Sequence, residues 1–173
     1  MAAKNPWTQY ILLLIAALIL LGVNFMKNRK YVQKTEPIFE LKADEVVEIT
    51  VAKDTLAVSL AKADTLWIFA TADTGEVNQS RIENFLKNIV EDGQYSGFQT
   101  SNPEKYSEYG IDDEKATKVT LKLADASEKT FYASRSKSGW THDYIRFEKD
   151  SKVYITTKKI MIYFSERAGF WRK

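Results

Sequence analysis

Residues 45–69 read EVVEITVAKDTLAVSLAKADTLWIF, and this stretch decides the fold. Apolar side chains occupy every second position in two successive runs, and polar or small residues stand between them: Val47, Ile49 and Val51, then Leu56, Val58 and Leu60. A period of two is typical of strands that bury one face. Asp54 supplies a turn between the two runs, and residues 63–65 supply a second turn before the apolar run 66–69. The pattern predicts a meander of three antiparallel strands.

The rest of the domain continues in helices and hairpins. Apolar residues at helical spacing predict a helix that begins at the cap residue Asn78 and ends at Gly93: Ile82, Phe85, Leu86 and Ile89. Pro103 starts a short helical stretch. Further strands are predicted around residues 119–123, at Phe131, at 144–147 and at 153–155. A C-terminal helix is predicted with one apolar side: Ile160, Tyr163, Phe164, Ala168 and Trp171.

These elements predict one α+β domain over residues 44–173, with a mostly antiparallel sheet and two covering helices. The two halves share the order of strands, hairpin and helix, and residues 63–68 echo residues 149–154. An internal duplication is one explanation. The other is that short acidic turns are common in hairpins.

The N-terminus carries a long apolar run that predicts a membrane anchor over residues 1–30, with a single transmembrane helix over about residues 7–26. About 20 residues in a helix rising about 1.5 Å each would cross the hydrocarbon layer. The residues assigned to the anchor are Trp7, Tyr10, Leu13, Ala16, Ala17, Leu20, Gly22 and Met26. A cleaved signal peptide is the alternative, but residues 24–27 offer no small-x-small cleavage pattern. Residues 31–43 mix charges with Pro37 and are expected to form a tether.

Composition excludes several kinds of chemistry. The formal charge of +2 is too small to indicate nucleic acid as a partner. The absence of cysteine excludes disulfides and thiolate sites, and a single histidine cannot furnish a zinc or haem site, so no cofactor and no metal are expected. Ser134, Ser136 and Ser138 precede His142 and Asp143, but no nucleophile elbow supports a triad. No catalytic residue is therefore assigned, and the chain is predicted not to be an enzyme.

Two sets of aromatic or apolar residues are candidates for contact surfaces. Trp67, Trp140, Tyr144 and Trp171 could form an aromatic ligand surface, although aromatics in alternating strands more often belong to a core. The C-terminal stretch is apolar on more than one side and carries basic residues. Its candidate partner contacts are Met161, Ile162, Phe170 and Trp171. An acidic partner or anionic lipid would suit such a surface, and a fully packed last helix is the alternative.

Several segments resemble the bacterial family of domain of unknown function 4340. They are residues 46–51, 66–69, 77–82, the Tyr109-Gly110-Ile111-Asp112 segment, residues 144–146 and residues 153–154. The chain departs from the family pattern where no proline follows Asp112 and where Ala133-Ser134 replaces a common glycine. The resemblance implies an anchored α+β domain outside the cytoplasm, associated with gliding-motility-type ABC transporters. It supplies no catalytic residues.

Two functions are expected from these observations. The first is a non-catalytic accessory or structural subunit of a membrane complex in a bacterial inner membrane, bound to other subunits through the transmembrane helix and the C-terminal helix. The second is an extracytoplasmic substrate- or polymer-binding module of an ABC-type transporter. The resemblance places the domain in the periplasm, whereas Lys27, Arg29 and Lys30 after the predicted span favour the cytoplasm.

Overall fold

The computed structural model describes residues 7, 10, 13–21, 34–70, 75–137 and 139–173, in two compact units, Met1–Lys34 and Thr35–Lys173. In the first unit residues 13–21 are helical, and their leucines are exposed, Leu13 by 67% and Leu20 by 70%. Among the described residues, no helix has the length and apolar character needed to cross a membrane. The predicted span extends further than these residues, and Gly22 and Met26 lie outside them.

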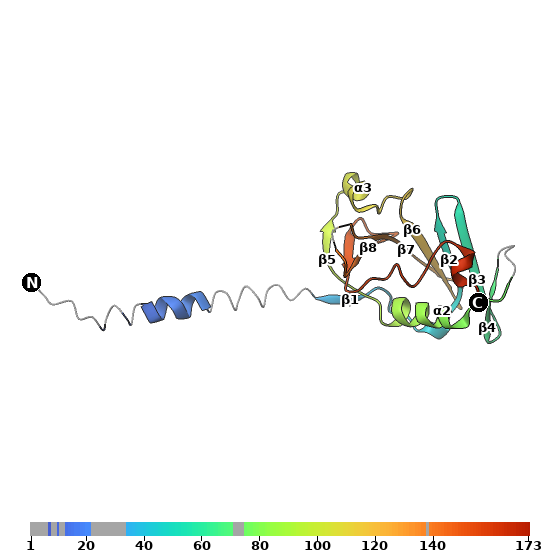
Figure 1. Cartoon of the computed structure of the whole chain (residues 1–173), viewed down its shortest axis with the longest axis horizontal. Helices are drawn as coiled ribbons and strands as arrows, with labels where there is room; N and C mark the ends of the chain where they lie inside the picture. The colour runs from blue at the N-terminus through green and yellow to red at the C-terminus, as the bar shows by residue number, and fades with distance from the viewer. Residues whose placement is uncertain (1–6, 8–9, 11–12, 22–33, 71–74, 138) are drawn as a thin grey trace, which may run out of the picture. The chain divides into compact units, whose positions relative to one another are not determined.

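The second unit is built on one nine-stranded sheet in which every neighbouring pair of strands is antiparallel (Figure 1). The strand order is β1-β5-β9-β8-β7-β6-β2-β3-β4. The strands are β1 (Thr35–Pro37), β2 (Val46–Lys53), β3 (Leu56–Ala63), β4 (Leu66–Phe69), β5 (Gln94–Thr100), β6 (Thr117–Leu123), β7 (Glu128–Arg135), β8 (Asp143–Phe147) and β9 (Val153–Thr156). The predicted α+β class, with a mostly antiparallel sheet, is confirmed.

The predicted meander forms as β2, β3 and β4. Ile49 on β2 lies opposite Leu60 on β3 and opposite Leu121 on β6, and all three side chains are completely buried. Asp54 and Asp64 turn the two hairpins with positive φ angles of 54° and 52°, a conformation that aspartate tolerates better than most residues. Pairing of β2 with β6 joins the first meander to the second and makes a single core.

One helical segment covers one face of the sheet. It comprises α2 (Gln79–Phe85) and the π-helical η2 (Leu86–Glu91), and the Asn78 side chain caps it by accepting the backbone N–H of Arg81 at 3.3 Å. Ile82, Phe85 and Ile89 are completely buried against the sheet. Gly93 follows as predicted, and a Cβ there would lie 2.3 Å from the Ile89 carbonyl oxygen. Close approach of the backbone therefore requires glycine at this position.

A second, smaller cluster covers the other face of the sheet. The helical turns η3 (Pro103–Lys105) and α3 (Tyr106–Tyr109), at the predicted Pro103 stretch, lie over it, on the side of the sheet away from α2 (Figure 1). Its buried members are Ile111, Ala116, Tyr144 and Val153. Successive residues of β8 divide between the faces, because Ile145 belongs to the main core and Tyr144 to this cluster.

The compact domain begins earlier than the expected boundary at residue 44. Thr35 pairs with Ser96 through the β1–β5 ladder, and Ile38 and Phe39 enter the main core, so these residues of the expected tether belong to the domain. The Phe39 ring packs edge-on against Phe131 at 5.5 Å. A short 3₁₀ turn, η1 (Ala43–Glu45), leads into β2.

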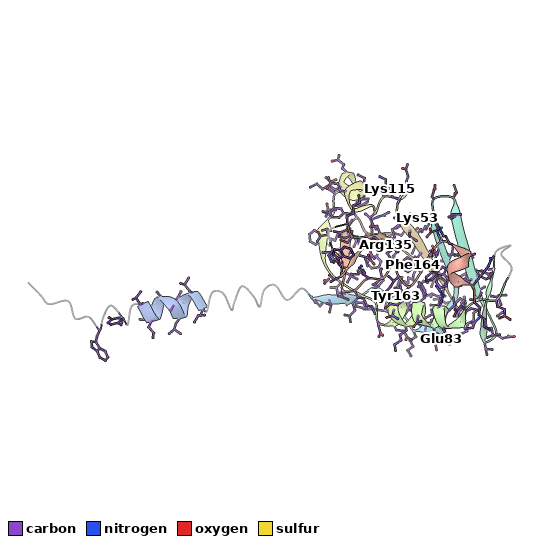
Figure 2. The ribbon with its side chains drawn as sticks, in the orientation of Figure 1. Lys53, Glu83, Lys115, Arg135, Tyr163 and Phe164 are labelled. Carbon is purple, nitrogen blue, oxygen red and sulfur yellow. The ribbon has the colours of Figure 1, made fainter. Side chains whose placement is uncertain are left out.

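The predicted second covering helix is wrong. Residues 157–167 run without a helix across the face that α2 also covers, and only α4 (Ala168–Trp171) is helical. The expected apolar residues still point inward: Ile160, Phe164 and Trp171 are buried, and Figure 2 labels Phe164 inside the domain. The carboxylate of Asp143 accepts the backbone N–H of Ile160 at 2.7 Å, and this bond ties the segment to β8.

The two turns that echo one another both join hairpins, but their backbones differ. Asp64 adopts a positive φ angle between β3 and β4. Asp150, between β8 and β9, instead uses its side chain to accept the backbone N–H of Lys152 at 2.9 Å. The two hairpins are thus closed by different turn chemistry.

Candidate binding site

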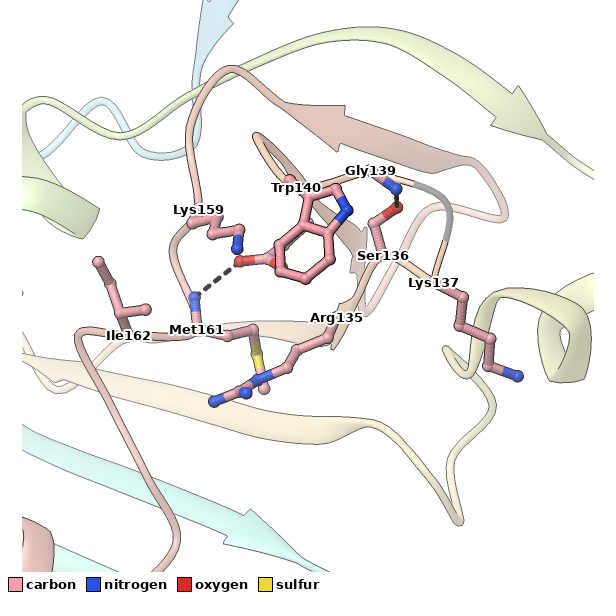
Figure 3. Close-up of a pocket in the computed structure, with 9 residues that line it drawn as sticks. Arg135, Ser136, Lys137, Gly139, Trp140, Lys159, Met161 and Ile162 are labelled. Carbon is pink, nitrogen blue, oxygen red and sulfur yellow. Dashed lines mark hydrogen bonds between the residues drawn. The ribbon is translucent and has the colours of Figure 1, made fainter.

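A pocket of about 290 Å³ opens where β7 ends and the C-terminal segment passes over β8 (Figure 3). Its lining residues come from three stretches: Arg135, Ser136 and Lys137 around the end of β7, Gly139, Trp140 and Asp143 up to the start of β8, and Lys159, Met161 and Ile162. Trp140 stands in this pocket with 89% of its surface exposed. It is by far the most exposed tryptophan of the domain.

Local hydrogen bonds shape the loop that carries Trp140. The Ser136 hydroxyl accepts the backbone N–H of Gly139 at 3.0 Å, which closes the loop on itself. The His142 ring lies against Gly139, where a Cβ would stand 2.1 Å from the histidine Cε1. Any larger residue at position 139 would therefore displace the ring. His142 also meets the Tyr144 ring edge-on at 5.8 Å.

Asp143 fixes the opposite wall. Its carboxylate is buried and accepts the backbone N–H groups of Ile160 and Met161 at 2.7 and 2.9 Å. The backbone N–H of Asp143 donates to the Thr156 hydroxyl at 2.8 Å, so β8, β9 and the C-terminal segment are joined at one point. Buried polar groups linked in this way hold a single geometry.

Cations dominate the charge of the pocket. Arg135, Lys137 and Lys159 line it, and among the described lining residues only Asp143 is acidic, with its carboxylate bound by backbone donors. The Lys159 ammonium lies 5.4 Å from the centre of the Trp140 ring, within the range of a cation–π contact. Figure 3 shows Lys159 and Arg135 beside the indole, with Lys137 extending away. The arrangement can hold an anionic group next to an aromatic surface.

The four residues considered for an aromatic ligand surface do not come together. Trp67, Tyr144 and Trp171 are buried, at 7%, 7% and 0% exposure. Trp171 packs edge-on against Phe85 at 5.9 Å, and its indole N–H donates to the Ser165 carbonyl at 2.7 Å. Trp140 alone among the four is exposed.

The predicted partner contacts of the C-terminal stretch lie in different environments. Ile162 is 56% exposed, and Met161 and Phe170 are half-buried. Trp171 is completely buried in the core, so its assignment as a partner contact is corrected. A second hollow, of about 310 Å³, shares Ile162 with the first and is lined by Arg81, Asn84, Ile162, Tyr163 and Phe170.

The residues weighed for a catalytic triad serve structural contacts in the described part of the chain. The Asp143 carboxylate binds backbone donors, and the Ser134 hydroxyl donates to the Tyr109 carbonyl at 2.6 Å. Ser138 lies outside the described residues. Among those described, no group of three histidine, aspartate or glutamate side chains could hold a metal ion.

Sequence reasoning did not find this pocket, because one wall comes from residues 159–162, which follow the residues of the other walls only after the β8–β9 hairpin. One local signal was available. Trp140 follows Ser136, Lys137, Ser138 and Gly139, a polar loop with no apolar alternation, so its indole had no strand face to occupy. A tryptophan in such a loop is a better surface candidate than one in a strand.

Comparison with known proteins identifies one family. No curated protein and no solved structure matches the chain. The family described as a domain of unknown function (DUF4340) matches residues 76–173, from the residues before α2 to the C-terminus, which is more than half of the chain and includes every residue of the Trp140 pocket. The chain therefore belongs to the DUF4340 family of domains of unknown function.

Proposed function

We propose that this chain is a non-catalytic accessory or structural subunit of a larger membrane protein complex, anchored in a bacterial inner membrane by a single span over about residues 7–26. The observation that carries the proposal is the apolar run itself. Its described helical part, residues 13–21, exposes the side chains of Leu13, Leu18 and Leu20 by 59–70%. Apolar surface of this extent is stable when lipid or a protein partner covers it.

The C-terminal segment supports attachment of the domain to a partner. Ile162 is 56% exposed, beside the half-buried Met161 and Phe170. The Arg81 guanidinium lies 4.6 Å from the centre of the Phe170 ring, and Lys158 and Lys159 flank the segment. An apolar surface with a basic rim suits a partner with an acidic rim.

Co-purification of the full chain in mild detergent tests this proposal. A complex subunit should bring stoichiometric partners with it. Ile162→Asp should weaken the association by about 10- to 100-fold, because one buried apolar side chain contributes about 1.5–3 kcal/mol. Leu56→Asp is the matched control, since Leu56 is 49% exposed on β3. Partners retained equally by both variants would place attachment elsewhere.

Mass spectrometry and labelling test the anchor and its orientation. The purified chain should retain residues 1–26, and a mature protein that begins after Met26 would contradict the anchor. We propose a periplasmic domain, with the cytoplasm as the alternative. The chain has no cysteine, so Thr55→Cys in the exposed β2–β3 turn provides a unique label. A membrane-impermeant thiol reagent should label it in intact spheroplasts, whereas labelling only after lysis would reverse the orientation.

A second candidate function is an extracytoplasmic substrate- or polymer-binding module that serves an ABC-type transporter. The Trp140 pocket favours it, because a hollow that combines an exposed indole with three cations offers a built surface for an anionic ligand. The pocket and the partner surface share Lys159, Met161 and Ile162, whereas Arg135 and Trp140 belong to the pocket alone.

A further inference from the structure

We propose that the Trp140 pocket binds a carboxylate-bearing sugar ring, as one residue of an acidic polysaccharide. This inference rests on the second function proposed above, the binding module. It assigns the class of ligand from the chemistry of the lining residues.

The indole of Trp140 provides a stacking platform. It is 89% exposed, and its loop is stabilised by the Ser136–Gly139 hydrogen bond and by the contact of His142 with Gly139. The indole thus presents an open ring face directly beside the cations that line the pocket. A pyranose ring presents a flat face of C–H groups that covers an indole while its hydroxyl groups remain in water.

The cations select an acidic sugar over a neutral one. Lys159 lies 5.4 Å from the indole centre, and Arg135 lines the same hollow. A carboxylate at the edge of a stacked ring would therefore lie beside an ammonium and a guanidinium. The planar guanidinium can bind a carboxylate through two parallel hydrogen bonds. Asp143 does not oppose this, because its carboxylate faces the backbone donors of Ile160 and Met161.

The size of the pocket and its neighbour indicate a polymer. About 290 Å³ is near the lower limit of ligand pockets and suits one ring rather than a large ligand. The adjoining hollow of about 310 Å³ shares Ile162 and repeats the pairing of a ring with a cation, in Phe170 and Arg81. Two neighbouring sites of similar chemistry could hold successive acidic sugar residues of one polysaccharide.

Two other anionic ligands fit the observations less well. Single-stranded nucleic acid is bound in basic grooves where successive bases stack on aromatic rings. Here the pocket offers one exposed ring instead of a row of rings along a groove. An anionic membrane surface is met by side chains that protrude together from a flat face, whereas Trp140 lines a pocket. Both are included as competitors in the test.

The test is calorimetric titration of the full chain in detergent with tetragalacturonate. The matched neutral probe is the same tetrasaccharide with its carboxyl groups reduced. Oligothymidylate and vesicles of phosphatidylglycerol are the competing probes. The variants are Trp140→Ala and Lys159→Gln. Matched controls are Phe98→Ala and Lys152→Gln, which change a similar pair outside this pocket. The Phe98 ring is 58% exposed, and the Lys152 ammonium lies 5.9 Å from its centre.

We expect tetragalacturonate to bind, each pocket variant to weaken binding by about tenfold or more, and the control variants to leave it unchanged. Binding should weaken as salt is raised. The proposal is overturned if tetragalacturonate does not bind, if the neutral tetrasaccharide binds equally well, if pocket and control variants behave alike, or if either competing probe binds more tightly. Co-purification of partners with the Trp140→Ala variant reports separately on the subunit function. Failure of the polysaccharide proposal therefore does not imply failure of the subunit proposal, and the reverse also holds.

Discussion

The carboxylate of Asp143 accepts the backbone N–H of Met161 at 2.9 Å, and this bond ties the first residue of β8 to the segment that follows β9. The same carboxylate oxygen also accepts the N–H of Ile160. One side chain thus ties the C-terminal segment to β8 and at the same time forms a wall of the Trp140 pocket.

Asp143→Ala should destabilise the domain by about 3–5 kcal/mol, because hydrogen bonds to a buried charged group contribute about 1.5–3 kcal/mol each and the two backbone donors would be left unpaired. Urea denaturation of the full chain in detergent, followed by circular dichroism, measures the change. Asp44→Ala is the control, since Asp44 is exposed in η1. Equal midpoints for the two variants would show that Asp143 contributes little.

Gln79→Ala should expose the edge of the sheet at β4. The Gln79 side chain accepts the Trp67 backbone N–H and donates to its carbonyl, both at 2.9 Å, so it occupies the outward hydrogen-bonding groups of this edge strand. Leu66 and Ile68 beside them are at least half exposed. Unpaired edges promote association between molecules. Loss of about 1–2 kcal/mol of stability is expected, with self-association.

Analytical ultracentrifugation at increasing concentration detects that self-association. Ser80→Ala is the control, because Ser80 is the exposed neighbour on α2. A Gln79→Ala protein that sediments like the control at every concentration would show that the amide does not protect the edge.

Arg146→Lys should destabilise the second cluster although the charge is retained. The buried guanidinium lies 4.1 Å from the centre of the Tyr132 ring and 5.0 Å from that of Tyr106, and it pairs with Asp113. An ammonium group cannot stack on two rings and bind a carboxylate in the same plane. We expect a loss of about 1–2 kcal/mol in thermal or urea denaturation. Arg167→Lys, at an exposed arginine, is the control, and a loss of the same size there would argue against stacking.

Stability should fall at alkaline pH through Tyr95. Burial, together with the hydrogen bond to Glu36, raises the pKa of Tyr95 from 10.0 to about 12. The folded state therefore holds the phenol proton more tightly than the unfolded state. This stabilisation is complete below about pH 10 and is lost as the pH rises through about 12. Burial, with a hydrogen bond to Asp150, also raises the pKa of Tyr154.

Tyr95→Phe should remove part of this alkaline dependence. Ultraviolet absorbance titration measures the pKa values of the phenols, and urea denaturation across the same pH range measures the free energy of unfolding. Tyr163→Phe serves as the comparison, since Tyr163 lies on the C-terminal segment, in the hollow lined by Arg81 and Phe170. A wild-type protein whose stability is flat from pH 10 to 12 would contradict the prediction.

The sequence by itself determined the elements whose signal is local. Alternating apolar residues in 46–69 predicted β2 to β4, because a strand with one buried face must repeat every two residues. Asn78 and Gly93 marked the ends of the α2–η2 segment, since unpaired backbone donors and close backbone approach restrict the residue type. The apolar character of Ile160 and Phe164 correctly predicted burial. The length and apolar character of residues 7–26 predict a membrane anchor, and this anchor remains a proposal.

Tertiary structure decided what depends on partners distant in the chain. The spacing of Ile160, Phe164 and Trp171 fits a helix as well as a non-helical path, and the structure has the non-helical path, tied to β8 through Asp143. The β1–β5 ladder drew residues 35–37 out of the expected tether, because an edge strand gains its hydrogen bonds from a neighbour some 60 residues away. The exposure of Trp140 beside Lys159 followed from the same packing. Hydrogen bonds and charge pairs between distant segments have no sequence period, so they appear only once the chain is folded.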